Sequence, residues 1–347
     1  MSYLSKTAAG LVPYVPGIQP EGSGWIKLNT NENPYPPSPE VAEALKSTDL
    51  SAIRRYPDSD SNMLVHTLAR HLEVPAENIF VGNGSDEVLA LAFSAFYSGQ
   101  QGVLMPDISY GFYPVWSQFF DLGVDYRPLT QNFTIDPSAY TDASGVVLAN
   151  PNAPTGIALN LDQIEQILQQ NPKGVVLVDE AYIDFATEKS AVSLVSKYDN
   201  LLVVRTFSKS HSLAGLRVGY AVGHVGLIAG LQRVKHSFNS YPLDTLAQTC
   251  AAASMADTAY WDDTRRQIIQ TRERTAVALQ GMGYSTLPSQ TNFLFVQVPD
   301  AKKQYEFLLS HKILVRYWEK PRLADFLRVS IGTEEEMEDF LTCVKQY

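Results

Sequence analysis

Three short apolar runs in the middle of the chain are each followed by side chains that can do chemistry. The pairs are Val146–Ala149 with Asn152, Val175–Val178 with Asp179 and Tyr182, and Leu201–Val204 with Lys209. Short continuous apolar runs are typical of strands buried on both faces. In open parallel sheets, ligand-binding groups lie just past the carboxyl ends of the strands. The pattern therefore predicts an amide, an acid, a phenol and an amine near one edge of a sheet.

Each of these residues also has an ordinary structural interpretation. Asp179 leaves an apolar strand, where a carboxylate needs a buried partner to stay charged, but it could equally cap a following helix. A lysine at a strand end is usually solvated, and Asn152 alone marks a loop. These residues occur together with Lys209, and Arg217 follows the lysine by eight positions. This combination favours a site built around an amine nucleophile.

A glycine-rich segment offers a candidate anion site. Gly82-Asn83-Gly84-Ser85-Asp86-Glu87 precedes a helix-like stretch, and free backbone N–H groups at a helix start, with the positive end of its dipole, attract anions. Taken alone the motif is a weak indication, because a serine followed by acids is also an ordinary helix cap.

Composition excludes several classes of protein. The 347 residues, 45% of them hydrophobic, are enough for an enclosed core and about two domains. A formal charge of −10 without any Lys/Arg run argues against a nucleic-acid partner. The first ten residues lack the apolar core of a signal peptide, and no run approaches the ~18 apolar residues of a membrane span. We therefore expect a cytoplasmic protein.

Cysteines and histidines form no redox or metal-binding pattern. Cys250 and Cys343 lie far apart without a CxxC pair, so reduced structural thiols are expected. His66 and His71 would not share a helix face, and His211, although near the lysine, is expected to be a loop residue rather than a base. No metal site is predicted.

Strand-like and helix-like stretches alternate through the first two thirds of the chain. A further strand is expected at Val218–Val222, and helices at Glu40–Lys46, Glu87–Tyr97 and Leu161–Gln169. This alternation predicts an α/β fold with a mostly parallel sheet. The many prolines through Pro39 predict an extended N-terminal arm rather than a regular helix.

The pattern changes after about residue 240. Helical periodicity covers Asp244–Gly281, strands are expected at Asn292–Val298, Ile313–Arg316 and Phe326–Ile331, and a helix at Glu334–Gln346 closes the chain. A second, smaller α+β domain is predicted. The expected division is an arm with part of the small domain at 1–45, a large cofactor-binding domain at 46–243 and the small domain at 244–347.

Taken together, the motifs resemble the fold-type-I pyridoxal-phosphate aminotransferases, specifically the histidinol-phosphate aminotransferase group. The blocks that carry the resemblance are Leu28-Asn29-Thr30-Asn31-Glu32-Asn33-Pro34, Asn150-Pro151-Asn152-Ala153-Pro154-Thr155-Gly156, Asp179-Glu180-Ala181-Tyr182, Ser208-Lys209-Ser210-His211-Ser212-Leu213-Ala214-Gly215-Leu216-Arg217 and Leu327-Arg328-Val329-Ser330. They occur in the family's order and span nearly the whole chain. The resemblance implies a large domain with a seven-stranded-type sheet between helices, and pyridoxal 5'-phosphate as cofactor. Ala153 departs from the asparagine common in the family, at a position with no assigned role.

The resemblance implies a role for each residue near the cofactor ring. Lys209 would hold the cofactor as an imine and then shuttle the α-proton. Asp179 would pair with the pyridine nitrogen and make the ring an electron sink. Asn152 and Tyr182 would donate hydrogen bonds to the phenolic oxygen, and Tyr110 would stack on the ring, although core packing is its ordinary alternative. The expected catalytic residues are Lys209, Asp179 and Tyr182.

The cofactor phosphate and the substrates complete the expected site. Ser85, Asp86, Ser208 and Arg217 would surround the phosphate, and Tyr56 would reach it from the neighbouring subunit of an obligate homodimer. Arg328 matches the residue that clamps an α-carboxylate, which suits a guanidinium fork. Arg316 and Tyr14 match the region that binds the substrate's own phosphate, although Arg316 could equally be a surface residue at a strand end.

The implied reaction is transamination between L-histidinol phosphate and 2-oxoglutarate, giving imidazole acetol phosphate and L-glutamate, in histidine biosynthesis. Three alternatives remain open from the sequence. An aromatic amino acid aminotransferase would use the same pocket, and a phosphothreonine-type decarboxylase would keep the cofactor residues but cleave another bond. A binding or regulatory protein is disfavoured, because Lys209 and Asp179 are both present.

Overall fold

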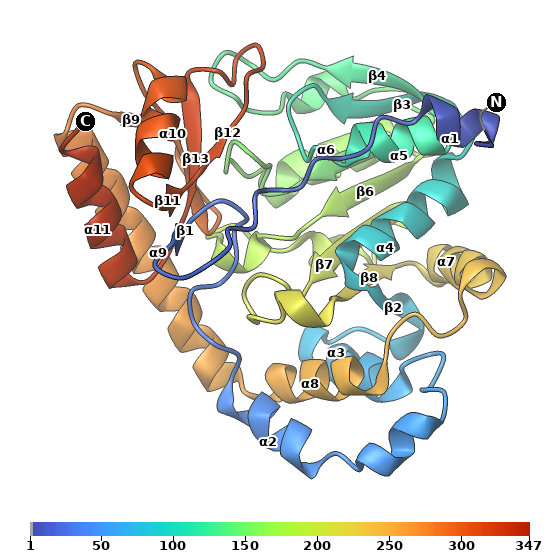
Figure 1. Cartoon of the computed structure of the whole chain (residues 1–347). Coiled ribbons are helices and arrows are strands. Elements are labelled where there is room, and N and C mark those ends of the chain that lie inside the picture. The colour runs from blue at the N-terminus through green and yellow to red at the C-terminus, as the bar shows by residue number, and fades with distance from the viewer. Residues whose placement is uncertain (1–2) are drawn as a thin grey trace.

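The computed structural model describes residues 3–347, and its main feature is a seven-stranded sheet with helices on both faces (Figure 1). The strand order is β2-β8-β7-β6-β5-β3-β4. Strand β8 is antiparallel to both of its neighbours, whereas the other neighbouring pairs are parallel. The mostly parallel sheet is therefore confirmed. The strands are β2 (Ile79–Asn83), β3 (Gln101–Pro106), β4 (Gly123–Arg127), β5 (Gly145–Ala149), β6 (Val175–Asp179), β7 (Leu201–Thr206) and β8 (Val218–Gly223).

Alternate residues of these strands face two separate apolar cores. In β6, Val176 and Val178 contribute to one core and Leu177 to the other, as the two-residue period of a strand requires. Helices α3 (Asn62–Leu72), α6 (Leu161–Gln170) and α8 (Thr245–Ala256) cover the first core, and α4 (Gly84–Ala92), α5 (Tyr113–Phe119) and α7 (Val225–Phe238) cover the second. Burial on both faces explains why the central strands are continuously apolar.

The C-terminal part of the chain builds a second, antiparallel sheet of order β12-β13-β10-β9. Its elements are β9 (Ser285–Thr286), β10 (Phe293–Gln297), β12 (Arg316–Tyr317) and β13 (Phe326–Ser330), with helices α9 (Thr258–Gly281), α10 (Ala301–Ser310) and α11 (Glu334–Val344). Leu294 and Val329 on one face pack in a core of their own with these helices, whereas Phe295 and Phe326 on the other face join the first core of the large sheet. That second face is therefore turned toward the seven-stranded sheet.

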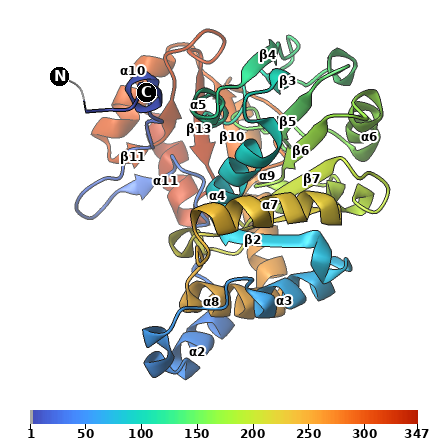
Figure 2. The ribbon, with the colours of Figure 1, turned by 90° about the vertical axis from the view of Figure 1, so that its right-hand side faces the viewer.

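The N-terminal arm forms a small two-stranded sheet with the C-terminal part. Its strand β1 (Ile26–Lys27) pairs in parallel with β11 (Ile313–Leu314) of the C-terminal part. Helix α2 (Pro39–Ser47) then lies against α8, and Figure 2 shows α2, α3 and α8 together beyond the edge strand β2. No helix within residues 3–347 is long and apolar enough to cross a membrane.

Several local predictions differ from the structure. The arm is not wholly irregular: α1 (Lys6–Gly10) forms before the first proline, with Ser5 accepting a hydrogen bond from the Ala8 backbone. The predicted helix 87–97 begins earlier, at Gly84, and its last turn, Phe93–Tyr97, is a π-helix.

Two longer predicted elements are each divided. The helical stretch 244–281 is interrupted at Asp257, which ends α8 and caps α9. The predicted strand 313–316 splits at Val315, because β11 pairs with β1 and β12 pairs with β13. Strands β2, β3 and β4 were not predicted.

Candidate active site

The sheet topology brings sequence-distant residues to one edge. Asp179 ends β6, Asn152 and Lys209 follow β5 and β7 by three residues each, and Gly84 follows β2 directly. Because β8 runs antiparallel, its first residue lies at this same edge, directly after Arg217. The edge is the carboxyl end of the parallel strands, where open α/β sheets bind ligands.

Lys209 is held in this edge by the N-terminal arm. Its Nζ donates to the carbonyl oxygen of Thr30 at 3.0 Å and lies 5.8 Å from the centre of the Tyr182 ring. Asn33 Nδ2 donates to the carbonyl oxygens of Lys209 and Ser210, both at 3.1 Å. Burial, followed by the positive charge of Arg328, lowers the pKa of Lys209 to about 8. A useful fraction of the amine is therefore uncharged near neutral pH, as a nucleophile or base requires.

Asp179 is buried and hydrogen-bonded on both oxygens. Its Oδ2 accepts from the Tyr113 hydroxyl at 2.8 Å and its Oδ1 from the Ala181 backbone N–H at 3.2 Å. Burial raises the pKa of Asp179 to about 6, and the Tyr113 hydrogen bond opposes that increase. A buried carboxylate in this state gains from a cationic partner, which a protonated ring nitrogen would supply. Sequence reasoning missed Tyr113.

Tyr182 is fixed by contacts from the arm and from β10. Its hydroxyl accepts from Asn31 Nδ2 at 3.0 Å, and its ring packs edge-on against Phe293 with centroids 5.2 Å apart. Asn31 has a left-handed backbone, φ 56°, and is held by Ser330, whose hydroxyl donates to Asn31 Oδ1 at 2.9 Å. Burial raises the pKa of Tyr182, so the phenol stays protonated and can donate a hydrogen bond.

Asn152 is buried at the same edge, but its amide is engaged within the protein. Its Oδ1 accepts from Ser109 Oγ at 2.8 Å. Its Nδ2 donates to the Ile108 carbonyl at 3.0 Å and to Thr155 Oγ1 at 3.2 Å. Because an amide nitrogen has two protons, a hydrogen bond from Asn152 to a cofactor would replace one of these contacts.

The start of α4 forms a cradle that fits a phosphate. Among the described residues, no side chain forms a capping hydrogen bond at the start of this helix, so its first N–H groups are free to meet an anion. Gly84 has φ +78°, and a Cβ there would lie 2.6 Å from Arg217 Nη2. A Cβ on Gly219 would lie 2.3 Å from the Ser85 backbone nitrogen. Both glycines are needed for this close approach, which keeps the guanidinium beside the helix start.

Arg217 and Asp86 form a small polar network at this cradle. Arg217 Nη1 donates to Ser208 Oγ at 3.3 Å, and Nη2 forms an ion pair with Asp86 Oδ2 at 3.2 Å. Asp86 Oδ1 also accepts from the Tyr110 hydroxyl at 2.9 Å. The carboxylate thus orients a cation and an aromatic ring, a role that does not require direct contact with a phosphate.

Two arginines lie side by side on the face of the second sheet that is turned toward Lys209. Arg316 of β12 and Arg328 of β13 are register partners. Arg328 Nη2 donates to the Asn29 carbonyl at 2.8 Å, and Arg316 Nη2 donates to the Val15 carbonyl at 3.2 Å. Within residues 3–347, neither guanidinium has a carboxylate partner within 4.0 Å. The pair can therefore bind an anion.

Tyr14 reaches the site from the arm. Its ring centroid lies 4.8 Å from that of Phe112 and 6.4 Å from that of Tyr110. Tyr56, in contrast, lies on the surface and contributes nothing to this edge within its own chain. It is 81% exposed and stacks on Tyr241 with ring centroids 4.7 Å apart.

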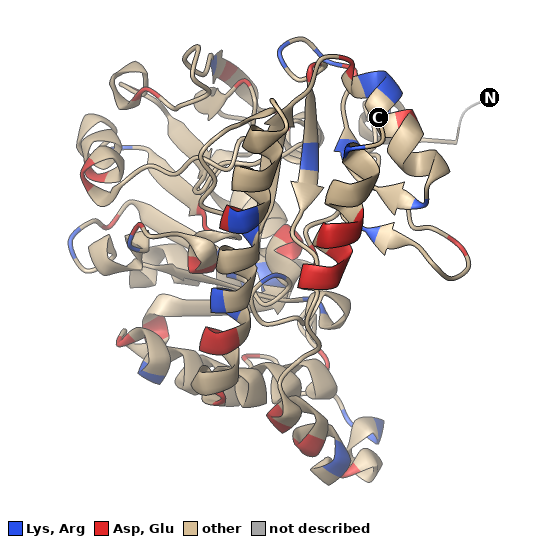
Figure 3. Ribbon diagram, turned by 90° about the vertical axis from the view of Figure 1, so that its left-hand side faces the viewer, with Lys and Arg blue, Asp and Glu red and all other residues tan. Residues whose placement is uncertain are grey.

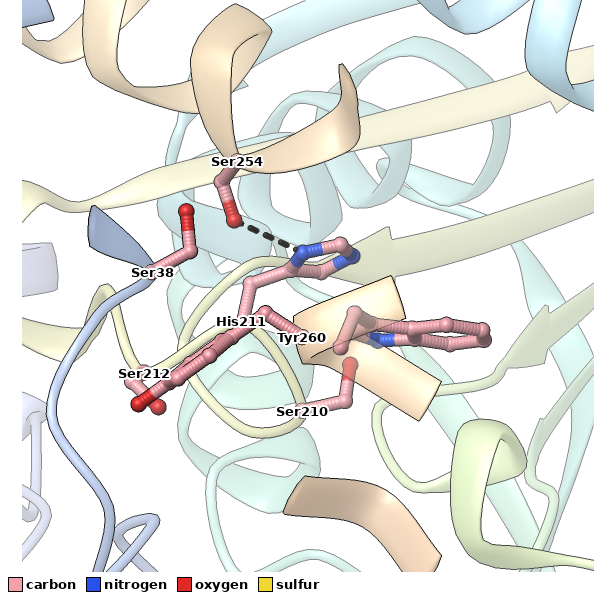
Figure 4. A pocket seen from close by; sticks show the side chains of 7 residues that line it. Ser38, Ser210, His211, Ser212, Ser254 and Tyr260 are labelled. Atoms are coloured by element: carbon pink, nitrogen blue, oxygen red, sulfur yellow. Dashed lines mark hydrogen bonds between the residues drawn. The ribbon is translucent and has the colours of Figure 1, made fainter. Parts of the chain in front are cut away.

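A small cavity lies behind the loop that carries Lys209 (Figure 4). His211 lines it, with its Nδ1 2.9 Å from Ser254 Oγ and its ring stacked on Trp261. Burial lowers the pKa of His211 to about 4, so its imidazole is neutral near neutral pH. These contacts suit a packing residue of the loop, as the sequence predicts.

The helices of the C-terminal part carry mixed or acidic charges. Acidic and basic residues are mixed along α9, the long helix in the centre of Figure 3, and the first turn of α11 is acidic. In the described part of the chain, no group of three or more His, Cys, Asp or Glu side chains could hold a metal ion.

Comparisons with known proteins agree with this geometry. The family model for aminotransferase class I and II matches residues 23–344. A histidinol-phosphate aminotransferase from Acinetobacter baumannii is 48% identical over 352 aligned residues, which cover 100% of this chain and 97% of that protein. A solved structure from Erwinia carotovora atroseptica, provisionally assigned to the same activity, has a TM-score of 0.85 at 29% identity and covers 93% of this chain and 95% of its own.

A further solved structure is similar in fold. The histidinol-phosphate aminotransferase from Sinorhizobium meliloti, in complex with pyridoxal-5'-phosphate, has a TM-score of 0.83 at 24% identity, with 92% and 89% of the two chains covered.

Proposed function

The chain belongs to the aminotransferase class I and II family, and we propose that it transfers an amino group between L-histidinol phosphate and 2-oxoglutarate in histidine biosynthesis. The products are imidazole acetol phosphate and L-glutamate. The observation that carries the substrate assignment is the pair Arg316 and Arg328, which face the Lys209 edge without carboxylate partners among the described residues. The cofactor is pyridoxal 5'-phosphate.

Pyridoxal phosphate, when bound, supplies an aldehyde carbon that takes up an amino group and a ring that withdraws electrons from the substrate carbon. We assign Lys209 as the residue that anchors it and later moves the proton at the substrate α-carbon. Its lowered pKa, about 8, supports both tasks because each needs an uncharged amine. The Thr30 carbonyl, 3.0 Å from Nζ, holds the amine in this edge of the sheet.

The remaining cofactor contacts follow from charge and donor type. Asp179 would keep the ring nitrogen protonated, because its buried carboxylate gains a countercharge. Tyr182 and Asn152 would donate hydrogen bonds to the ring oxygen. The free N–H groups at the start of α4, including that of Ser85, would bind the phosphate together with Ser208 and Arg217. Asp86 would hold Arg217 and Tyr110 in place, and the Tyr110 ring would stack on the cofactor.

The two arginines would serve both half-reactions. L-Glutamate presents an α-carboxylate, which one guanidinium fork can bind through two hydrogen bonds. L-Histidinol phosphate has no carboxylate but carries a phosphate monoester of about −1.5 to −2 charge near neutral pH. Two adjacent guanidiniums suit that charge, so Arg316 and Arg328 would bind the phosphate together, with Tyr14 nearby.

A half-reaction assay tests this proposal. The visible spectrum of the purified holoenzyme is recorded as L-histidinol phosphate, and separately L-glutamate, is added. Conversion of the cofactor to its amine form by both donors is expected. An Arg316→Gln variant should lose more efficiency with histidinol phosphate than with glutamate. A wild-type enzyme that accepts glutamate but not histidinol phosphate would refute the substrate assignment.

One observation favours a second candidate, an aromatic amino acid aminotransferase. Tyr14, Tyr110 and Phe112 gather beside the site, with the Tyr14 and Phe112 centroids 4.8 Å apart, and such a cluster can pack against an aromatic side chain. Competition between phenylalanine and histidinol phosphate separates the two candidates. Release of carbon dioxide without a keto acid would instead indicate the decarboxylase.

The active unit is proposed to be a homodimer in which Tyr56 reaches the partner's cofactor phosphate. Tyr56 is 81% exposed, and the nearby apolar residues Leu50 and Ile53 are exposed at 66% and 49%, a pattern typical of an interface. Analytical ultracentrifugation tests the assembly, and a Tyr56→Phe variant should bind the cofactor more weakly while remaining dimeric. A stable monomer with full activity would overturn this proposal.

We also propose a division into domains and a cellular location. The division into 1–45, 46–243 and 244–347 is supported by the separate core of the C-terminal part. A cytoplasmic location is supported by Cys250 and Cys343, which are buried and unpaired.

A further inference from the structure

Trp318 occupies a position that none of the roles above explains. It follows Arg316 by two residues and directly follows the last residue of β12. Since side chains two apart share a face of an extended strand, Trp318 lies on the same side as Arg316. Tyr317, between them, points the other way and stacks on Tyr305 with centroids 5.8 Å apart.

The Trp318 ring contacts both substrate-binding guanidiniums. Arg328 Cζ lies 5.2 Å from the ring centre, and Arg316 Cζ lies 5.4 Å from it. Both distances are within the range of a cation–π attraction, for which indole is the best ring. Two like charges on facing strands normally repel each other. An aromatic ring shared by both cations offsets that repulsion and keeps them together.

The segment after Trp318 fixes the ring in place. Arg322 donates from Nη1 to the Leu129 carbonyl at 3.0 Å and lies 3.6 Å from Asp107, and its guanidinium covers the Phe133 ring at 4.8 Å. The Trp318 ring itself packs against the first core of the large sheet. The indole therefore belongs to a segment anchored on both sheets and cannot easily move away from the arginines.

We propose that Trp318 is a positioning residue that sets specificity by holding Arg316 and Arg328 as a convergent pair for a phosphate dianion. This inference rests on the proposed function. Each of the two carboxylates of L-glutamate needs one guanidinium fork, so glutamate depends little on the convergence of two guanidiniums on a single group. A phosphate carries a larger charge and more acceptor oxygens, so it depends on both.

The test compares Trp318→Leu and Trp318→Phe with the wild-type holoenzyme. Titration calorimetry measures the affinity for inorganic phosphate, and half-reactions measure kcat and KM for L-glutamate and L-histidinol phosphate. In Trp318→Leu we expect phosphate affinity to fall about tenfold, from the loss of two cation–π contacts. The KM for histidinol phosphate should rise by a similar factor with kcat nearly unchanged, and the KM for glutamate should change less than about twofold.

Two controls separate positioning from damage to the fold. Trp318→Phe keeps an aromatic face and should recover most of the phosphate affinity. Tyr317→Leu removes a ring of the same strand from the opposite face and should leave the ratio of the two KM values unchanged. Equal losses for phosphate and glutamate in Trp318→Leu, or no loss of phosphate affinity, would overturn the inference. Failure of wild-type turnover with histidinol phosphate would refute only the proposed substrate, because inorganic phosphate binding still tests Trp318.

Discussion

Replacing Tyr113 by phenylalanine should destabilise the ionised form of Asp179 and so raise the pKa of its carboxyl group. The hydroxyl of Tyr113 lies 2.8 Å from Asp179 Oδ2, and both residues are buried. A hydrogen bond to a charged group contributes about 1.5–3 kcal/mol, which corresponds to about one to two pH units in pKa. The pKa of Asp179, about 6 with Tyr113 present, should therefore rise to neutral pH or above.

The acid limb of the pH–activity profile should move to higher pH in Tyr113→Phe. In its proposed role Asp179 acts as a carboxylate. Activity should therefore be lost as pH falls through its pKa, and a higher pKa should move that loss to higher pH. Carbon-13 NMR of the side-chain carboxyl carbons in the apoenzyme measures the titration of Asp179 directly. An Asp179→Asn variant identifies its resonance. The acid limb of the kcat profile of the holoenzyme should move in the same direction.

Tyr97→Phe is the matched control. Tyr97 is fully buried in the same core as Tyr113, and its hydroxyl donates to the Val175 carbonyl at 3.2 Å, away from Asp179. Its removal costs a buried hydrogen bond without touching the carboxylate. An Asp179 titration in Tyr113→Phe that overlays those of Tyr97→Phe and the wild type would refute the reasoning.

Three further predictions concern the lysine, the phosphate cradle and the histidine. Covalent capture of pyridoxal by the apoenzyme, followed by stopped-flow absorbance, should accelerate as pH rises through about 8, where Lys209 loses its proton. In Arg328→Gln the midpoint of this acceleration should lie at higher pH, because a positive charge that lowers the pKa of Lys209 is removed. An unchanged midpoint would contradict this effect of the Arg328 charge. Gly84→Ala should weaken the binding of pyridoxal phosphate about tenfold or more, because the new Cβ would lie 2.6 Å from Arg217 Nη2. The binding of pyridoxal, which lacks the phosphate, should not change. The control Gly283→Ala has a similar φ of +91° but nothing within 4 Å of the new Cβ, and it should bind both compounds normally. His211→Gln should leave the acid limb of kcat/KM in place, because the pKa of His211 is already about 4, and a displaced limb would show that this imidazole titrates during turnover.

The residues that the sequence could reveal are those that follow buried strands. Asp179 and Lys209 were predicted from the apolar runs before them, because both faces of a central strand are covered and leave a continuous hydrophobic signal. Strand β4 was not predicted, because it lies at the sheet edge, is only partly covered and contains Asp125 and Arg127. The order of the elements along the chain also did not reveal that β8 is antiparallel to β7. Because β8 runs in this direction, Arg217, directly before it, lies at the same edge of the sheet as Lys209.

Residues that act through a partner were beyond sequence reasoning. Tyr113 is the first residue of α5 and reads as a core aromatic, and only the approach of α5 to β6 brings its hydroxyl to Asp179. Trp318 likewise follows a two-residue strand that carries no periodic signal. Asn33 belonged to a recognised motif, but its bonds to the carbonyl groups of Lys209 and Ser210 span 176 and 177 positions and depend on how the arm crosses the sheets.

The arm also links the groups that we propose for substrate binding and catalysis. Three consecutive residues contact three different site residues: the Asn29 carbonyl accepts from Arg328, the Thr30 carbonyl from Lys209, and the Asn31 amide donates to Tyr182. Strand β1, just before them, is paired with β11 of the C-terminal part. A movement of the C-terminal part would therefore carry along the backbone that positions the Lys209 amine. The Arg328 guanidinium uses Nη2 for the Asn29 carbonyl, and its Nε has no partner among the described residues. An anion bound by the remaining donors of this fork would therefore be linked through Asn29 and Thr30 to the Lys209 amine.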